Sequence, residues 1–494
     1  MFEEQLTAQP PLLVRWFTTG EPVILGRWIF LRALGAVFLS AFYSLYFQVH
    51  GLIGPNGILP AGQYLAMAHR AVGGKAYWLA PTLLWINASD RALDALVWVG
   101  LTASVAIMIN IAPRISIAIA AICFLSFIGA AQDFSSYQSD GMLLEAAFLS
   151  LFFAPRGLRP ALARSQPPTR ASTWLLRWEW FRIYFESGLV KLMSGEPQWR
   201  NLTAMDKYYE NGPLPTWLGW HVQNWPHAFH AASTAVTLIV ELFVVGLIFF
   251  GPWPRLIAFL ITTPLQIGII LTANYAFLNY LVLFLGVLLV EDRFFGPNGA
   301  PAPTPARPSL MQAFILPIHF ITTSMMFLFP LFPTAYLLQP TRIANNFGLF
   351  AVMTRARYEI EFQGTADGEH WVAYLFRYKP QDPMKAPGIY APYQPRFEWN
   401  LWFASLGTVE DNPWVMNTQA RLLQNAPAVL RLFARNPFAA HPPAAVRAMQ
   451  WQYRFTTPAE HKQTGAWWHR ELLGAYAPTA MRAPDGRIAF ESEP

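Results

Sequence analysis

Residues 174–203 read WLLRWEWFRIYFESGLVKLMSGEPQWRNLT, and this stretch decides how the rest of the chain is organised. It begins as a helix of membrane length, yet its apolar part contains Glu179, Arg182 and Glu186. Ionisable groups are costly in hydrocarbon unless they face protein or water. Because the three residues fall at i, i+3 and i+7, they share an arc of roughly 60° on one helix face. The stretch therefore predicts a buried core helix over 173–193, with an ion pair between Arg182 and Glu186.

Two further basic residues, Arg177 and Lys191, lie on other faces near the two ends of this helix. Long side chains at such places can extend along apolar surface and keep their charge in water. The helix then meets the turn-forming residues Ser194-Gly195-Glu196-Pro197 and continues into an aromatic and polar segment.

The composition predicts a mainly α, polytopic membrane protein. Of 494 residues, 54% are hydrophobic and 13% are charged, whereas a soluble globular domain has about 25% charged residues. The net charge of +6 comes from arginines scattered through short loops, so we expect no nucleic acid as a partner. The single cysteine, Cys123, excludes an intramolecular disulfide and a cysteine-rich metal site. No nucleotide-binding or metalloprotease motif is present either, and we expect neither a cofactor nor a metal.

Apolar stretches of about the 20 residues that a bilayer requires predict nine membrane spans. A further piece, Ala76–Ile86, is short and contains Pro81, so we interpret it as re-entrant or interfacial. If it does span, every later orientation is inverted. The nine spans are 28–50, 91–111, 115–131, 140–154, 173–193, 231–250, 255–272, 276–290 and 313–338.

Basic loops indicate the orientation. The loop 155–177 contains five arginines and no acid, so we expect it to be cytoplasmic. Counting spans from this loop places everything after about Leu338 on the extracytoplasmic side.

Two domains are predicted. Residues 1–338 form the membrane domain, which includes a Pro/Ala linker at 296–308. Residues 339–494 form a small α+β domain, because 355–378 resembles a hairpin, 446–456 alternates like a half-buried strand, and 412–433 has a helical pattern. About 150 residues can form their own core, so we expect this tail to fold independently.

The acids inside or near apolar spans have two interpretations. Either each is paired or protonated and holds helices together, or together with Arg182 they line a buried polar site that opens to the outer loops. The intramembrane polar residues concerned are Glu145, Glu179, Arg182, Glu186 and Glu241.

Three histidines, His221, His227 and His230, precede the sixth predicted span among tryptophans. Their spacing does not place all three on one helix face, so an interfacial aromatic belt is favoured over a metal site.

The run FRIYFESGLVKLMSGEPQWRNLTAMDKYYENGPLPTWLGW (181–220) resembles the lipase maturation factor family. Residues 28–65 and the block QDFSSYQSDGMLLEAAFLSLFFAPRGLRP (132–160) are similar to the same family, and so are FQGTADGEHW and APYQPRFEWNLWFA in the tail. The residues that match the family motif are Ser187, Gly188, Lys191, Ser194, Gly195, Pro197, Trp199, Arg200, Leu202 and Thr203.

This resemblance implies a chaperone-like maturation factor of the secretory pathway, which helps lipases or other exported proteins to fold. It implies a multi-pass protein of the endoplasmic reticulum membrane in a eukaryote, or of the inner or plasma membrane in a bacterium. The family's client contacts are attributed largely to the C-terminal domain, which we expect to be extracytoplasmic.

An alternative stays open, because the helix-rich half is also distantly similar to the membrane domain of vitamin K-dependent carboxylases. The protein would then be a membrane-embedded enzyme that acts on a quinol or a lipid-like substrate. Its candidate catalytic residues are Glu186, Lys191 and Arg182.

Overall fold

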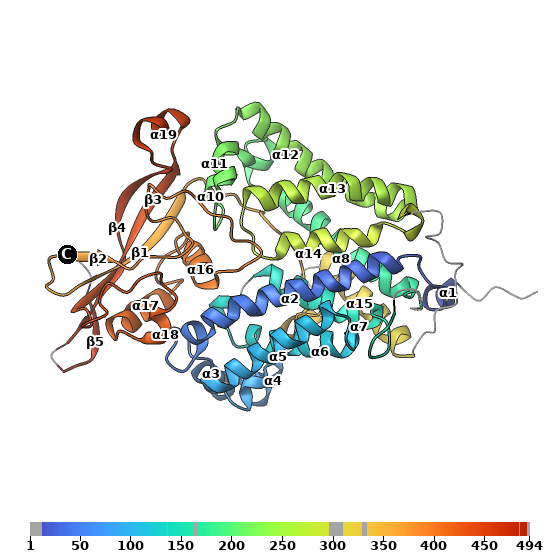
Figure 1. The fold of residues 1–494 in the computed structure, drawn as a ribbon, viewed down its shortest axis with the longest axis horizontal. Coiled ribbons are helices and arrows are strands. Elements are labelled where there is room, and N and C mark those ends of the chain that lie inside the picture. The colour runs from blue at the N-terminus through green and yellow to red at the C-terminus, as the bar shows by residue number, and fades with distance from the viewer. Residues whose placement is uncertain are drawn as a thin grey trace, which may run out of the picture.

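The structure is a computed structural model that describes residues 12–135, 137–161, 166–295, 310–328, 333–483 and 485–491. The Pro/Ala linker predicted at 296–308 lies outside these ranges. Long helices gather in one half of the molecule, and a β-sheet stands at the opposite end (Figure 1). The helices of the first half are α1 Leu12–Thr18, α2 Ile24–Ile53, α3 Ala61–Val72, α4 Ala76–Leu79, α5 Asp90–Met108, α6 Pro113–Ile128, α7 Gln138–Phe153, α8 Arg170–Met193, α9 Pro197–Arg200, α10 Tyr208–Asn211, α11 Trp217–Gln223, α12 His227–Leu242, α13 Pro252–Thr272, α14 Leu278–Gly286 and α15 Leu310–Leu328.

Five helical segments of the described chain are long and apolar enough to cross a membrane, and they lie at Ile24–Ile53, Asp90–Met108, His227–Phe250, Pro252–Thr272 and Met311–Leu328. Each of the other four predicted spans also lies on a helix. Of these, α6 and the helix Leu278–Leu289 are apolar but shorter, α7 is a 16-residue helix, and α8 is rich in charge. The predicted count of nine spans is therefore not confirmed. The segment Ala76–Ile86 forms only α4 and the single 3-10 turn Leu83–Trp85, both too short to span.

Small residues bring α2 and α5 into close contact. A Cβ added at Gly100 would lie 2.3 Å from the ring of Phe42, and one at Gly35 would lie 2.9 Å from the carbonyl oxygen of Ser104. Without side chains at these two positions, the helix backbones can approach as they do in other membrane bundles.

The C-terminal part is α+β, as predicted. Its elements are α16 Arg396–Ala404, α17 Trp414–Leu423, α18 Pro427–Leu430, α19 Pro458–Thr464, β1 Arg357–Thr365, β2 Trp371–Ala373, β3 Ala445–Phe455, β4 Trp468–Arg482 and β5 Ile488–Glu491. The strands form one antiparallel sheet in the order β2-β1-β3-β4-β5. The predicted hairpin and strand correspond to β1, β2 and β3, whereas β4, β5 and α16 were not predicted from the sequence. Strand β4 does not show the regular two-residue alternation that predicts a strand. It contains Gly474 at φ 135° and Pro478, and its pairing with β3 shifts register.

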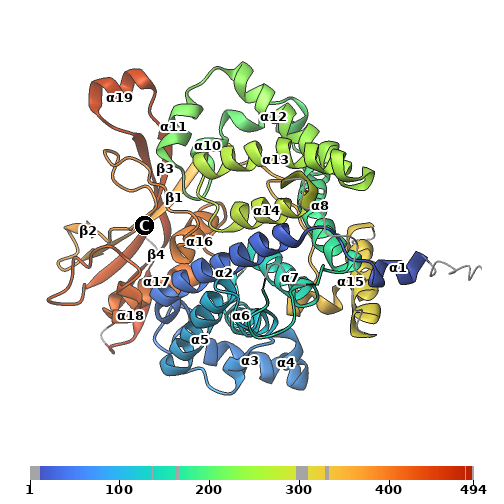
Figure 2. The ribbon, with the colours of Figure 1, turned by 45° about the vertical axis from the view of Figure 1, so that its right-hand side comes forward.

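Helix α16 joins the two halves. It lies between the sheet and α2, and it contacts both (Figure 2). One continuous hydrophobic cluster contains residues of the membrane helices, such as Phe38 and Phe124, together with Phe397 and Trp414 of the tail.

A tail expressed alone would expose that shared surface. We therefore expect residues 343–494 by themselves to show no cooperative thermal transition, contrary to the expectation from the sequence, and circular dichroism of the isolated tail tests this.

Candidate functional site

Helix α8 is buried along most of its length, and its polar face contacts other elements rather than water. Arg182, which is fully buried, forms an ion pair with Glu145 of α7 and donates to the carbonyl oxygen of Asn345 at 2.7 Å. Its Nη1 lies 3.8 Å from the carboxylate of Glu186, so the predicted pair exists but is the looser of the two. Sequence spacing showed the neighbour one turn away, whereas the nearer partner comes from another helix.

Several hydrogen-bond donors surround the carboxylate of Glu145. Its Oε2 accepts from the backbone N–H and from the side-chain amide of Asn345, both at 3.1 Å, and its Oε1 lies 3.4 Å from Nε2 of His319. Glu179 is buried within electrostatic range of Glu145 and Arg182. Four of the five predicted intramembrane polar residues therefore form one cluster. Of its other partners, His319 lies on α15 within the last predicted span, and Asn345 follows that span.

The segment 345–350 is held against α8 by a series of hydrogen bonds. The N–H of Phe347 donates to Glu186 at 2.6 Å, and the N–H of Leu349 donates to Ser187 Oγ at 3.2 Å. The N–H groups of Asn345 and Gly348 donate instead to α7, to Glu145 at 3.1 Å and to Gln138 at 3.0 Å. Glu186 thus binds a main-chain amide, and we call this set of contacts the α8 clasp.

The family-motif residues after α8 build the turn that continues the α8 clasp. Gly195 has φ 80°, and Pro197 begins α9, as proline often does at the first helical position. Arg200 donates to the carbonyl oxygen of Leu192 at 2.8 Å. The indole N–H of Trp199 donates to the carbonyl oxygen of Phe350 at 3.0 Å. The motif closes with Leu202, at φ 61°, and Thr203.

Lys191 lies in different surroundings. Both carboxylate oxygens of Glu241 on α12 are 2.7 Å from its Nζ, which also lies 5.0 Å from the ring centre of Trp199. Lys191 is only 2% exposed, so the expectation that it extends to the membrane surface was wrong. The same holds for Arg177, which is buried and donates to the carbonyl oxygen of Leu288 at 2.9 Å. The Lys191 and Glu241 pair faces a cavity of about 490 Å³ that neither Arg182 nor Glu186 lines.

Gly188 allows this pairing, because a Cβ there would lie 2.8 Å from the Cβ of Glu241. We expect Gly188→Ala to force α12 away and to lower the free energy of unfolding by about 1–3 kcal/mol, the usual range for overpacking. Chemical denaturation in detergent measures the change. Gly246→Ala is the control, since nothing lies within 4 Å of a Cβ at that position. Equal stability of the two variants would contradict the argument.

A second buried ion pair joins the membrane half to the tail. Arg396 of α16 donates to both carboxylate oxygens of Asp140 on α7, at 2.7 and 2.8 Å, and to the carbonyl oxygen of Phe134 at 2.9 Å. Asp140 is 0% exposed and Arg396 is 1% exposed. Neither residue was predicted from the sequence as a site residue. Asp140 lies in the family-like block 132–160, and Arg396 lies in APYQPRFEWNLWFA.

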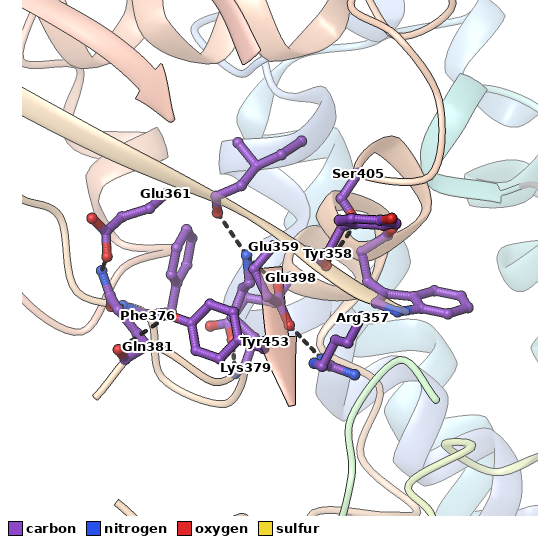
Figure 3. Close-up of polar contacts among 12 residues, drawn as sticks. Arg357, Tyr358, Glu359, Glu361, Phe376, Lys379, Gln381, Glu398, Ser405 and Tyr453 are labelled. Atoms are coloured by element: carbon purple, nitrogen blue, oxygen red, sulfur yellow. Dashed lines mark hydrogen bonds and ion pairs between the residues drawn. The ribbon is translucent and has the colours of Figure 1, made fainter. Parts of the chain in front are cut away.

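The tail has its own polar cluster around β1 (Figure 3). Arg357 pairs with Glu359 and also donates to the carbonyl oxygen of Pro213 in the membrane half at 3.0 Å. Lys379 lies 2.7 Å from Glu359, while its backbone N–H and those of the two preceding residues donate to Glu398. Burial raises the pKa of Glu398 to about 6, and these hydrogen bonds oppose the shift.

The three histidines have different partners. His221 lies on α11, and His227 and His230 lie in the first turns of α12. His227 lies 2.9 Å from Asp206, His230 lies 3.1 Å from the carbonyl oxygen of Trp225, and His221 packs edge-on against the adjacent tryptophan ring.

Two family models match the chain: "lipase maturation factor transmembrane domain" over residues 25–297, and "lipase maturation factor C-terminal domain" over residues 343–478. The first covers more than half of the chain. The chain belongs to the lipase maturation factor family. Among its relatives, lipase maturation factor 1 of Bos taurus is 32% identical over 93% of this chain and 89% of its own length. Lipase maturation factor 2 of Gallus gallus is 30% identical over 93% of this chain and 82% of its own length.

Lipase maturation factor 1 of Homo sapiens is 29% identical over 92% of this chain and 87% of its own length. No solved structure matches the chain. The predicted boundary at residue 338 falls between the two family models, and the α8 clasp and the Asp140–Arg396 pair connect residues on either side of it. This lipase maturation factor family member is a multi-pass membrane protein.

Proposed function

We propose that this protein is a membrane-anchored maturation factor that binds an incompletely folded exported protein, with lipases as the client class that the family name indicates. The observation that carries the proposal is a groove at the junction of the two halves. It has a volume of about 950 Å³ and lies between the C-terminal end of α2, the loops at 377–397 and α18.

Tyrosines dominate this junction groove. Its aromatic side chains include Tyr43, Tyr46 and Phe47 of α2, and of these Tyr43 and Phe47 are about half exposed. Charged side chains from both halves, among them Arg377 and Asp94, also line the groove. Tyrosine and arginine are enriched where proteins bind one another, because each combines a large contact surface with hydrogen-bonding groups. An unfinished client exposes apolar segments that such a surface can cover.

The rigid junction supports the same function. Gln48, which lines the junction groove, donates to the carbonyl oxygen of Gln394 at 3.0 Å and so joins α2 to the opposite wall. The Asp140–Arg396 pair anchors the start of α16, next to the lining residue Phe397, on α7. A preformed surface loses less conformational freedom on binding than a disordered one.

Site-specific crosslinking tests the proposal. A photoreactive phenylalanine analogue at Tyr46 or Tyr393 should crosslink a co-expressed, newly made lipase, whereas the same group at Tyr77, which is 55% exposed on α4, should not. Tyr46→Ser should lower the fraction of secreted lipase that is active, and Tyr77→Ser should not. Equal crosslinking at all three positions would contradict a role for the junction groove.

We also propose that the C-terminal part lies on the extracytoplasmic side, as the five-arginine loop at 155–177 supports. A reporter that is active only outside the cytoplasm, fused after Pro494, should be active. Activity of a cytoplasm-only reporter at the same position would contradict the proposal: either the loop 155–177 is not cytoplasmic, or the number of spans between it and the tail is even.

A further inference from the structure

A cavity of about 490 Å³ lies among α8, α12, α13 and α14, and none of Glu145, Glu179, Arg182 and Glu186 lines it. Its volume falls within the roughly 300–1,000 Å³ of small-molecule sites. Most of the lining is apolar, and its buried polar side chains include Tyr184, Ser187, Lys191, Glu241, Gln266 and Asn279.

Two of these polar side chains lack a partner for one of their atoms. Gln266 is 6% exposed and donates to the hydroxyl of Tyr184 at 2.7 Å, but its Oε1 accepts no hydrogen bond within the described part of the chain. Asn279 is 5% exposed, and its Nδ2 donates none there. Buried polar atoms are nearly always hydrogen-bonded, since leaving one unpaired costs free energy. An acceptor and a donor are therefore both available to a bound molecule.

The charges in the cavity balance. Lys191 is held by both oxygens of Glu241, so the pair contributes one positive and one negative charge at hydrogen-bond distance. A charged ligand would have to separate this pair or be buried without a counter-ion, and both are costly in a low-dielectric site. The site therefore fits a ligand with an uncharged polar headgroup that can both donate and accept a hydrogen bond, as a hydroxyl group can.

Part of the lining comes from α12 and α13, which belong to the two candidate spans with the highest mean hydropathy. Val236 of α12 is 50% exposed, and Gly268 of α13 is also exposed at the edge of the cavity. Both helices are candidate membrane spans, so these exposed faces are where hydrocarbon would lie. The cavity thus opens sideways toward lipid and ends inside at hydrogen-bonding groups.

We propose that this cavity binds an uncharged amphiphile, with a hydroxyl-bearing head at Gln266 and Asn279 and an apolar tail that leaves between α12 and α13. Two sources share this chemistry, a diacylglycerol and an isoprenoid quinol. The proposal does not depend on client binding at the junction groove.

The test uses the full-length protein in nanodiscs and three photoactivatable probes: a diacylglycerol, an isoprenoid quinol kept reduced, and a phosphatidic acid as the charged comparison. We expect labelling of peptides from α12 and α13 by one of the two uncharged probes, saturable and competed by the same unlabelled lipid. Labelling by the diacylglycerol or by the quinol identifies the source. Gly268→Trp, which places a ring at the opening, should reduce this labelling at least tenfold.

The matched control is Gly246→Trp, since a Cβ at either glycine meets no atom within 4 Å and Gly246 does not line the cavity. Gln266→Leu and Asn279→Leu, each checked for a monodisperse, thermally stable protein, should weaken competition without closing the opening. Equal labelling of the wild type and Gly268→Trp would overturn the proposal. So would labelling by phosphatidic acid as strong as that by the uncharged probes, or saturable labelling by none of the three.

Discussion

Glu145→Ala is expected to lower the free energy of unfolding by about 3–5 kcal/mol, the cost of removing one partner of a buried ion pair and stranding the other. Arg182 would remain fully buried with only a carbonyl oxygen and the more distant Glu186 as acceptors. Asn345 would also lose the acceptor for two of its N–H groups. Chemical denaturation in detergent measures the loss, and hydrogen exchange should locate it at residues 343–350.

Glu186→Ala is the informative comparison for Glu145→Ala. It removes one hydrogen bond to the N–H of Phe347 and an ion pair at 3.8 Å, so its cost should be about 1–3 kcal/mol. Arg182→Met combined with Glu145→Leu should recover part of the stability lost in Glu145→Ala, because the guanidinium is then no longer stranded, although Glu186 loses its cationic neighbour. A larger loss in Glu186→Ala than in Glu145→Ala would show that the pair inferred from sequence spacing is the dominant one after all.

Asp140→Ala should cost a comparable amount, about 3–5 kcal/mol, but at a different place. Arg396 would lose both carboxylate contacts while it stays enclosed between α7 and the tail. We expect α16 and the loop before it to gain hydrogen exchange, with the amides of residues 345–349 still protected. Under the proposed function, secretion of active lipase should fall together with this change, since α16, whose Phe397 and Glu398 line the junction groove, would lose its anchor on α7.

The control for Asp140→Ala is Arg454→Ala, which breaks an ion pair with Glu460 whose side chains are 42% and 38% exposed. Exposed pairs of this kind contribute little to stability, so the variant should unfold like the wild type. If Asp140→Ala instead leaves the protection of α16 unchanged, the two halves are held together mainly by their shared apolar core.

Several features could be predicted from local sequence patterns. The charge-bearing face of 173–193 predicted a buried helix, and α8 is buried with Glu179, Arg182 and Glu186 inside. The hairpin around residues 364–368 followed from turn residues between runs rich in aromatic and β-branched side chains, which are local signals. The number of spans did not follow, because hydropathy cannot separate a lipid-facing helix from one that is enclosed by other helices, as α7 is.

The sequence by itself determined the family, the helical membrane half, the α+β tail and the residue types that needed partners. Only the tertiary structure decided which residues are their ion-pair and hydrogen-bond partners. Arg182 binds Glu145 from 37 positions away, and Asp140 binds Arg396 from 256 positions away. Helical periodicity describes neighbours within one or two turns, whereas these contacts depend on how separate elements pack. For the same physical reason the unpaired atoms of Gln266 and Asn279, on two different helices, became visible as one site only after the chain was folded.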